Sequence, residues 1–160
     1  MQTFITDSSI TPTMRALDTQ RLGKQRVEAM QIHQILISRD YSKGWGSHPA
    51  VKMWAGFDRW LAVYGMRACQ EFRNRGYTDN LLDYFQSYHS DDQYKDVPPW
   101  WHDDRIHMSH KRNLVCKDYN FYSPIFNVRP SMTYFWPTQS REYFFDGSRC
   151  VRWSDHVARL

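Results

Sequence analysis

Residues 18–39, DTQRLGKQRVEAMQIHQILISR, decide the fold because their apolar side chains recur at helical spacing. Asp18 or Thr19 can begin this helix, since a short oxygen side chain accepts the free backbone N–H groups of a first turn. We expect the helix to run to about Arg39. Its predicted buried stripe consists of Leu22, Ala29, His33, Leu36 and Ile37. The stretch therefore predicts one long helix that packs in an all-α core.

A second stripe of the same helix is polar and carries Arg21, Lys24, Gln25 and Glu28. One interpretation is a solvated face on which Glu28 pairs with cations one and two turns away. The other is a functional carboxylate among cations that also attract phosphate. A carboxylate in such surroundings is ionised at neutral pH and stabilises a cationic intermediate. The spacing is compatible with both interpretations.

Arg26 and His33 share the apolar stripe, where polar groups need hydrogen-bond partners or a function. The structural interpretation is an arginine with a buried stem and a hydrogen-bonded core histidine. The functional interpretation places both in a site.

The rest of the chain continues the helical pattern. We expect an extended arm over residues 1–17, a second long helix capped by Ser47 or His48 and stopped by Gly76, a third helix opening at Thr78 or Asp79, and a fourth capped by Asp103 or Asp104. Residues 118–137 are aromatic and interrupted by proline, and Asp146-Gly147 predicts a small β-hairpin. The predicted fold class is all-α: a compact single-domain bundle of about four helices, with a helical domain over 1–137 and a C-terminal extension over 138–160 packed on it.

Composition limits the functional classes. The 160 residues suit one globular domain, and a formal net charge of +4 favours polyanionic partners such as nucleic acid. The three cysteines are odd in number and form no CxxC pair, which is typical of reduced, intracellular thiols. No signal-peptide pattern, membrane-spanning run, P-loop, GxGxxG or GxSxG is present. We therefore expect a cytoplasmic protein with no membrane contact, outside the common nucleotide-binding and serine-hydrolase classes.

A second polar cluster, SHKRNL, occupies residues 109–114. Its hydroxyl, imidazole and cations can hold a phosphate backbone, or they can form an ordinary exposed helix face. His102, His107, His110 and Cys116 lie close enough in sequence to be considered as zinc ligands. No HExxH or paired CxxC motif accompanies them, so we predict no metal site.

Short motifs follow one another in a fixed order between residues 17 and 136. They are Leu17-Asp18, Arg21-Leu22, Lys24-Gln25-Arg26, Glu28-Ala29, Trp45, His48-Pro49, Met53-Trp54, Arg75-Gly76-Tyr77, Ser109-His110, Asn113-Leu114, Lys117-Asp118, Tyr134 and Trp136-Pro137. In this order and spacing the chain resembles the pyrimidine dimer DNA glycosylases, the endonuclease V type of bacteriophages and their bacterial relatives. That family is all-helical, which agrees with the periodicity described above.

The resemblance implies a DNA repair activity. In that family the α-amino group of the first residue attacks C1′ of a damaged pyrimidine nucleotide, displaces the base and forms a Schiff base that leads to β-elimination. An α-amine is partly neutral, and so nucleophilic, near neutral pH. Here Gln2 follows Met1, and Met before Gln is normally retained, so the implied nucleophile is the Met1 amine. Glu28 matches the glutamate that supports the imine, and Arg26 matches the arginine near it.

The resemblance also implies double-stranded DNA as the partner and a monomeric protein of a bacterial or phage-infected cell. No cofactor is implied, since imine chemistry uses only protein and water. The residues expected to bind DNA are Arg21, Lys24, His48, His110, Lys111, Arg112 and Lys117. Trp and Tyr side chains are expected to fill the gap left by a flipped nucleotide.

Two other functions remain open because a fold does not fix a function. One is a DNA-modifying transferase on the same scaffold, which predicts a pocket for a small co-substrate near Glu28 and His33. The other is a non-catalytic DNA- or protein-binding module, which predicts that Met1 points away from Glu28 and that no cleft joins them.

Overall fold

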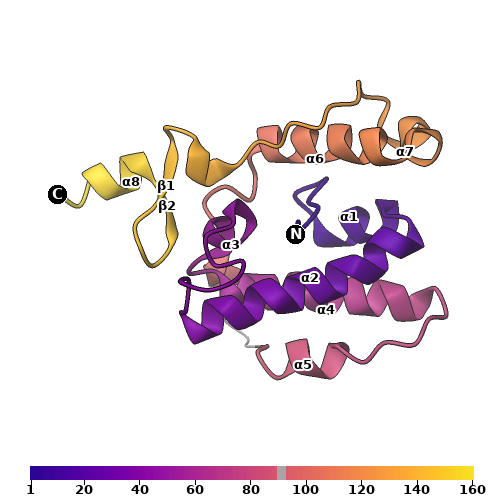
Figure 1. Cartoon of the computed structure of the whole chain (residues 1–160), viewed down its shortest axis with the longest axis horizontal. Coiled ribbons are helices and arrows are strands. Elements are labelled where there is room, and N and C mark those ends of the chain that lie inside the picture. Colours follow the sequence, from indigo (N-terminus) through magenta and orange to yellow (C-terminus); the bar gives the residue numbers. More distant parts are fainter. Residues whose placement is uncertain (90–92) are drawn as a thin grey trace.

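A computed structural model describes residues 1–89 and 93–160 of the chain (Figure 1). The described elements are α1 Ile10–Ala16, α2 Thr19–Ser38, α3 Pro49–Trp54, α4 Asp58–Asn74, α5 Leu82–Gln86, a 3-10 turn Gln93–Asp96, α6 Asp104–Lys117, α7 Tyr119–Phe126, a 3-10 turn Pro137–Gln139, β1 Tyr143–Phe145, β2 Cys150–Arg152 and α8 Trp153–Val157. The predicted all-α class is confirmed, although the helices are shorter and more numerous than expected. Across the described ranges, no helix has the length and apolarity needed to cross a membrane.

Helix α2 lies at the centre of the fold and packs against α4 (Figure 1). It begins at Asp18, whose side chain accepts a hydrogen bond from the backbone N–H of Arg21 at 3.0 Å. Its buried stripe contains, as predicted, Leu22, Ala29, His33 and Leu36. The prediction is wrong for Ile37, which is 41% exposed, while Ile32 takes the inward position. The helical period therefore predicts most of the buried face of α2 and misassigns one residue at the edge of that face.

The second long helix is interrupted, contrary to the sequence prediction. Helices α3 and α4 are separated by a short bend in which Gly56 has a φ of +80°. The C-terminal tail packs into this bend. The backbone N–H of Cys150 donates to the carbonyl of Ala55 at 3.0 Å, and a Cβ on Gly56 would lie 2.4 Å from the Cβ of Arg149. The local sequence favours one continuous helix, but the bend that receives the C-terminal tail divides it in two.

Helices α1, α7 and α8 lie where no helix was predicted. The end of α1 is capped by Arg75, whose guanidinium donates to the carbonyl oxygens of Leu17 at 2.8 Å and Met14 at 3.1 Å. Helix α7 begins at Asp118, whose side chain caps its first turn. Pro124 within α7 conceals the helix in the sequence, because proline normally ends a helical pattern.

The predicted hairpin is present at the C-terminal end. Strands β1 and β2 pair antiparallel, with Phe145 opposite Cys150, and Gly147 in the turn has a φ of +99°. The hairpin is anchored in the core, since Tyr143 is 3% exposed and Cys150 is fully buried. The hairpin therefore packs on the helices, whereas α8 after it has no buried residue and lies at the end of the molecule (Figure 1).

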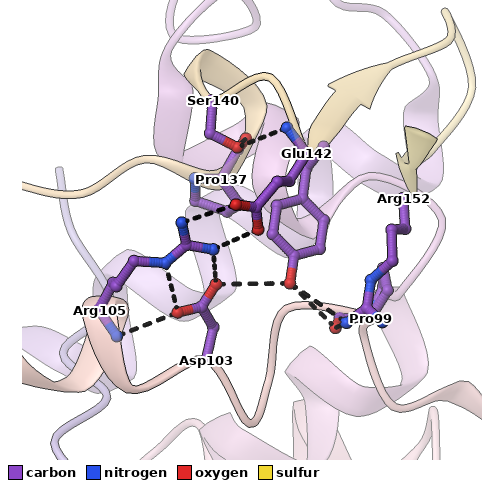
Figure 2. A network of polar contacts seen from close by, with 8 residues as sticks. Pro99, Asp103, Arg105, Pro137, Ser140, Glu142 and Arg152 are labelled. Atoms are coloured by element: carbon purple, nitrogen blue, oxygen red, sulfur yellow. Dashed lines mark hydrogen bonds and ion pairs between the residues drawn. The ribbon is translucent and has the colours of Figure 1, made fainter. Parts of the chain in front are cut away.

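A polar network joins the tail to the start of α6 (Figure 2). Arg105 forms ion pairs with the carboxylates of Asp103 and Glu142, and this guanidinium holds the pKa of Asp103 below its usual value. The carbonyl of Pro99 accepts a hydrogen bond from Arg152 at 3.1 Å. Because Arg105 and Glu142 are largely exposed, these contacts orient the tail more than they stabilise the fold.

We expect Gly65→Ala to lower the free energy of unfolding by about 1–3 kcal/mol, although alanine in a helix is ordinarily about 1 kcal/mol better than glycine. The reason is close packing of α4 against α5, since a Cβ on Gly65 would lie 2.3 Å from the ring of Phe85. Urea unfolding measures the change. Gly23→Ala is the control, because its Cβ meets only the edge of the Phe72 ring at 3.3 Å. Equal stability of the two variants would contradict the close approach of α5.

Candidate active site

The N-terminal segment runs through the interior between α2 and α6 (Figure 1). Residues 2–6 are buried, although they belong to no helix or strand. Buried backbone N–H groups need acceptors, and neighbouring side chains supply them here. The N–H of Phe4 donates to Gln25 Oε1 at 2.7 Å, and the N–H of Ile5 donates to His110 Nδ1 at 2.9 Å. Side chains of two helices thus hold an extended segment that has no partner strand.

We call the side chains that hold residues 2–5 the N-terminal clamp. Gln25 is its centre and is 1% exposed. Its Nε2 donates to the carbonyl of Gln2 at 3.1 Å, and its Oε1 lies 2.7 Å from the Tyr64 hydroxyl. That hydroxyl also lies 2.7 Å from the Phe4 carbonyl oxygen. Burial raises the pKa of Tyr64 well above its usual value, and the charge of Glu28 raises it further. Tyr64 therefore remains a neutral hydroxyl that supports the clamp.

The clamp places the start of the chain beside Glu28. The backbone N–H of Gln2 donates to Glu28 Oε2 at 3.1 Å, and Gln25 Nε2 lies 3.4 Å from the same oxygen. The Met1 amine is one residue from Gln2, so covalent geometry keeps it within about 7 Å of this carboxylate. The first residue and the predicted glutamate are therefore neighbours.

A cavity of about 450 Å³ opens beside Met1. Its walls combine the N-terminus, the polar stripe of α2 and side chains from later segments. Prominent among the lining residues are Arg21, Lys24, Gln25, Glu28, His48, Lys117, Tyr134 and Trp136. The polar stripe that the sequence left with two interpretations thus forms a wall of a cavity.

The cavity is positively charged around one carboxylate. Of the described residues that line it, Arg21, Lys24 and Lys117 are cations and Glu28 alone is an anion. Arg21 is held by an ion pair with Asp18 at 2.7 Å, whereas Lys24 and Lys117 are exposed. Exposed and pre-positioned cations at one opening are suited to phosphate groups.

Aromatic rings form the opposite wall. His48 contacts Trp45 and Trp136 edge-to-face with centroids 5.5 and 5.8 Å apart, and Tyr134 lies 5.3 Å from Trp136. Burial lowers the pKa of His48, and the nearby N-terminal ammonium lowers it further. Burial raises the pKa of Tyr134 to about 12. Both rings are therefore neutral near pH 7 and suit a planar base.

The structure brings six predicted site residues to this one cavity: Met1, Arg21, Lys24, Glu28, His48 and Lys117. Their roles remain predictions, but their proximity is a structural fact. The binding-module alternative predicts that no cleft joins Met1 to Glu28, and the shared cavity contradicts that prediction.

Arg26 is not among the residues that line the cavity, and its catalytic role remains a prediction without support from this site. Its guanidinium pairs with Asp79, whose side chain is fully buried, and lies 3.8 Å over the ring of Phe72. Asp79 in turn accepts the N–H of Leu82 at 2.9 Å at the start of α5. Arg26 therefore joins α2 to α4 and α5, through a guanidinium that is largely buried rather than turned to solvent as its structural interpretation predicts.

The cluster at residues 109–114 is also largely separate from the cavity. His110 is fully buried and its Nδ1 is occupied by Ile5, so the predicted contact of His110 with DNA is wrong. Arg112 donates to the carbonyl of Arg129 at 3.1 Å. DNA contacts by Lys111 and Arg112, which are not among the residues lining the cavity, remain predictions.

His33 is a core histidine. It is fully buried, its Nδ1 lies 2.8 Å from the Tyr84 hydroxyl, and burial lowers its pKa. It does not line the cavity that contains Glu28. The shared co-substrate pocket predicted by the transferase alternative is therefore not formed by these two residues.

The histidines considered as zinc ligands have other partners. His107 Nε2 lies 3.0 Å from the Trp101 carbonyl oxygen, and His110 binds Ile5. Within residues 1–89 and 93–160, no three His, Cys, Asp or Glu side chains form a group able to hold a metal ion.

Sequence reasoning missed Gln25 as a site residue, although it placed Gln25 on the correct stripe. Its position three residues before Glu28 was the available signal, but a neutral amide carries no charge pattern that reveals a clamp. Tyr134 and Trp136 entered only through the family resemblance. Their place in the cavity depends on the path of the segment that follows α7, which has no regular secondary structure before Pro137.

The fold and cavity define an all-helical protein that holds its N-terminus beside a carboxylate among cations. The family model for pyrimidine dimer DNA glycosylase matches residues 1–85, just over half of the 160-residue chain. The chain belongs to the pyrimidine dimer DNA glycosylase family, and DNA is the partner that this membership implies. No curated protein and no solved structure matches the chain.

Proposed function

We propose that the protein is a DNA glycosylase with AP-lyase activity, which acts on damaged or modified pyrimidines in double-stranded DNA through the Met1 amine. The observation that carries the proposal is the clamped N-terminus. Buried side chains of α2 and α6 hold residues 2–5, and the Gln2 N–H lies 3.1 Å from Glu28 Oε2. A structural role alone gives no reason to set a chain terminus at a cationic cavity.

The proposed reaction uses groups that line the cavity. The neutral Met1 amine attacks C1′, and the bond from C1′ to the base breaks with its electron pair remaining on the base. The amine loses a proton to Glu28, and Glu28 passes this proton to O4′ as the C1′–O4′ bond breaks to give an iminium ion. Loss of a 2′ proton then expels the 3′ phosphate by β-elimination. Once it has passed the proton on, the Glu28 carboxylate is charged again and favours the cationic iminium.

The remaining walls support DNA as the substrate. Arg21, Lys24 and Lys117 surround the opening and can contact backbone phosphates on either side of the reacting nucleotide. Trp136 and the exposed Trp45 offer ring faces to a flipped base or to the gap that it leaves.

Borohydride trapping tests the proposal. The protein, with its N-terminal residue checked by mass spectrometry, is incubated with duplex DNA that carries an abasic site or a thymine dimer. We expect a covalent adduct that peptide mapping assigns to residue 1. Protein acetylated at its α-amine is the control and is expected to form no adduct.

Two results would contradict the proposal. An adduct on a lysine side chain would remove the N-terminal amine from the mechanism. No adduct on either duplex, with DNA binding intact, would favour a different reaction on modified DNA or a binding function.

A further inference from the structure

We propose that the His48 Nε2–H group donates a hydrogen bond to the departing pyrimidine and so assists cleavage of the bond from C1′ to the base at a thymine dimer. The inference rests on the proposed glycosylase function and adds a residue to its first chemical step. It follows from the tautomer that the fold imposes on His48 and from the place of its ring in the cavity.

The start of α3 fixes the tautomer of His48. Its Nδ1 accepts a hydrogen bond from the backbone N–H of Ala50 at 3.1 Å, which makes His48 the N-cap of this helix. A neutral imidazole carries one proton, and an Nδ1 that accepts must leave that proton on Nε2. His48 is therefore a hydrogen-bond donor at its other ring nitrogen and is not available there as a base.

Neighbouring rings hold the His48 ring in its place at the cavity. Trp45 and Trp136 contact the His48 ring edge-to-face from two segments, and the ring lines the cavity together with Met1 and Glu28. The Tyr134 hydroxyl on the same wall already donates to Asn113 Oδ1. Within this wall, His48 thus presents a neutral N–H donor close to the nucleophilic amine.

A donor at this position has a defined chemical use. When the bond from C1′ to the base breaks, the base keeps the electron pair, and negative charge spreads from N1 to the carbonyl oxygen on C2. A pre-positioned N–H donor stabilises such charge and costs no reorganisation as the charge develops. The base later takes a proton from water, so His48 does not need to be reprotonated in each turnover. An abasic site has no base to expel, and the donor has no function there.

The His48→Asn variant separates this role from helix capping. Asparagine is a favoured N-cap, and its Oδ1 can accept the Ala50 N–H, but it has no group at the position of Nε2. We expect cleavage of the bond from C1′ to the base at a thymine dimer to slow about tenfold or more under single turnover. Borohydride trapping on an abasic duplex should change by less than about twofold, since imine formation there requires no leaving base. His102→Asn, at an exposed histidine outside this cavity, is the matched control and should behave as the wild type.

The possible results are distinguishable. An equal loss on both duplexes would overturn the inference, because it would place His48 in DNA binding or in positioning the amine. Unchanged rates on both would overturn it as well. Wild-type trapping at the abasic site without activity on the thymine dimer would overturn it while leaving the imine chemistry in place. No wild-type adduct at the abasic site would overturn the proposed function and this inference together. If His48→Asn does not fold, His48→Ser retains an N-cap oxygen and carries the same expectations.

Discussion

Replacing Glu28 with glutamine is expected to lower the rates of imine formation and strand cleavage by about 100-fold or more. The carboxylate takes the proton released by the amine and stabilises the iminium charge, and an amide does neither. DNA affinity is expected to stay the same or to increase, because the substitution removes the one anion among the described residues of a cationic cavity.

The substitution preserves the geometry of the N-terminus. The introduced glutamine side chain still offers an oxygen to the Gln2 N–H, which in the wild type lies 3.1 Å from Glu28 Oε2. A fall in rate can therefore be attributed to charge rather than to release of the N-terminal segment. Thermal unfolding of the variant checks this point, and its midpoint should lie close to that of the wild type.

Single-turnover cleavage and borohydride trapping measure the effect of Glu28→Gln, and binding is measured at matched salt, since phosphate contacts depend strongly on ionic strength. Glu142→Gln is the control, because Glu142 is an exposed glutamate of the tail and pairs with Arg105. A Glu28→Gln protein with wild-type rates would show that the carboxylate serves only to anchor Gln2.

The parts of the fold that the sequence predicts correctly depend on local rules. Asp18 and Asp103 cap α2 and α6 as expected, because capping requires only a short oxygen side chain before a helical run. The polar stripe of α2 was recognised from spacing alone, and it became a cavity wall. Helical periodicity acts over a few residues, so it can be read without knowing the rest of the fold.

Arg26 shows how proximity in sequence misleads. It precedes Glu28 by two residues, and two residues turn an α-helix by about 200°, so the two side chains point to different sides of α2. Glu28 faces the cavity, whereas Arg26 faces Asp79 at the start of α5. Helical geometry already opposed a shared role, but the family resemblance grouped the two residues together.

The N-terminal clamp and the bend at Gly56 depend on distant contacts. His110 binds Ile5 across 105 residues of sequence, and Cys150 binds Ala55 in the bend between α3 and α4. Nothing in the local pattern around either acceptor indicates these partners. Long-range packing of this kind is decided by the assembled core, so sequence patterns leave it open.

His110 is expected to make the folded protein lose stability on mild acidification. Burial, together with the nearby His107, lowers its pKa to about 3. An unfolded histidine has a pKa of about 6.5, so between these values the unfolded chain binds a proton that the folded chain does not. The free energy of unfolding therefore falls as pH falls through this window. From pH 6.5 to 4.5 the loss from His110 is about 2–3 kcal/mol.

Other groups with shifted pKa values can be separated from this effect. Burial also lowers the pKa of His33 and His48, which adds to the slope in the same direction. Carboxylates such as Asp18 and Asp79 have pKa values below their usual 3.8, so they contribute their loss of stability mainly below pH 4. The window from pH 4.5 to 6.5 therefore reports on histidines.

Urea unfolding across this window, with wild type and His110→Asn compared, measures the effect. Asparagine Oδ1 can accept the Ile5 N–H that now lies 2.9 Å from His110 Nδ1, so the clamp keeps an acceptor while the titrating group is lost. The variant is expected to be less stable than the wild type at pH 7.5, since its side chain is smaller, but to show a flatter pH dependence by about 1 kcal/mol per pH unit. His102→Asn removes an exposed histidine and should leave the slope unchanged. If the two variants retain the same slope as the wild type, His110 does not stay neutral in the folded protein, and its assignment as a buried acceptor for the N-terminal segment is wrong.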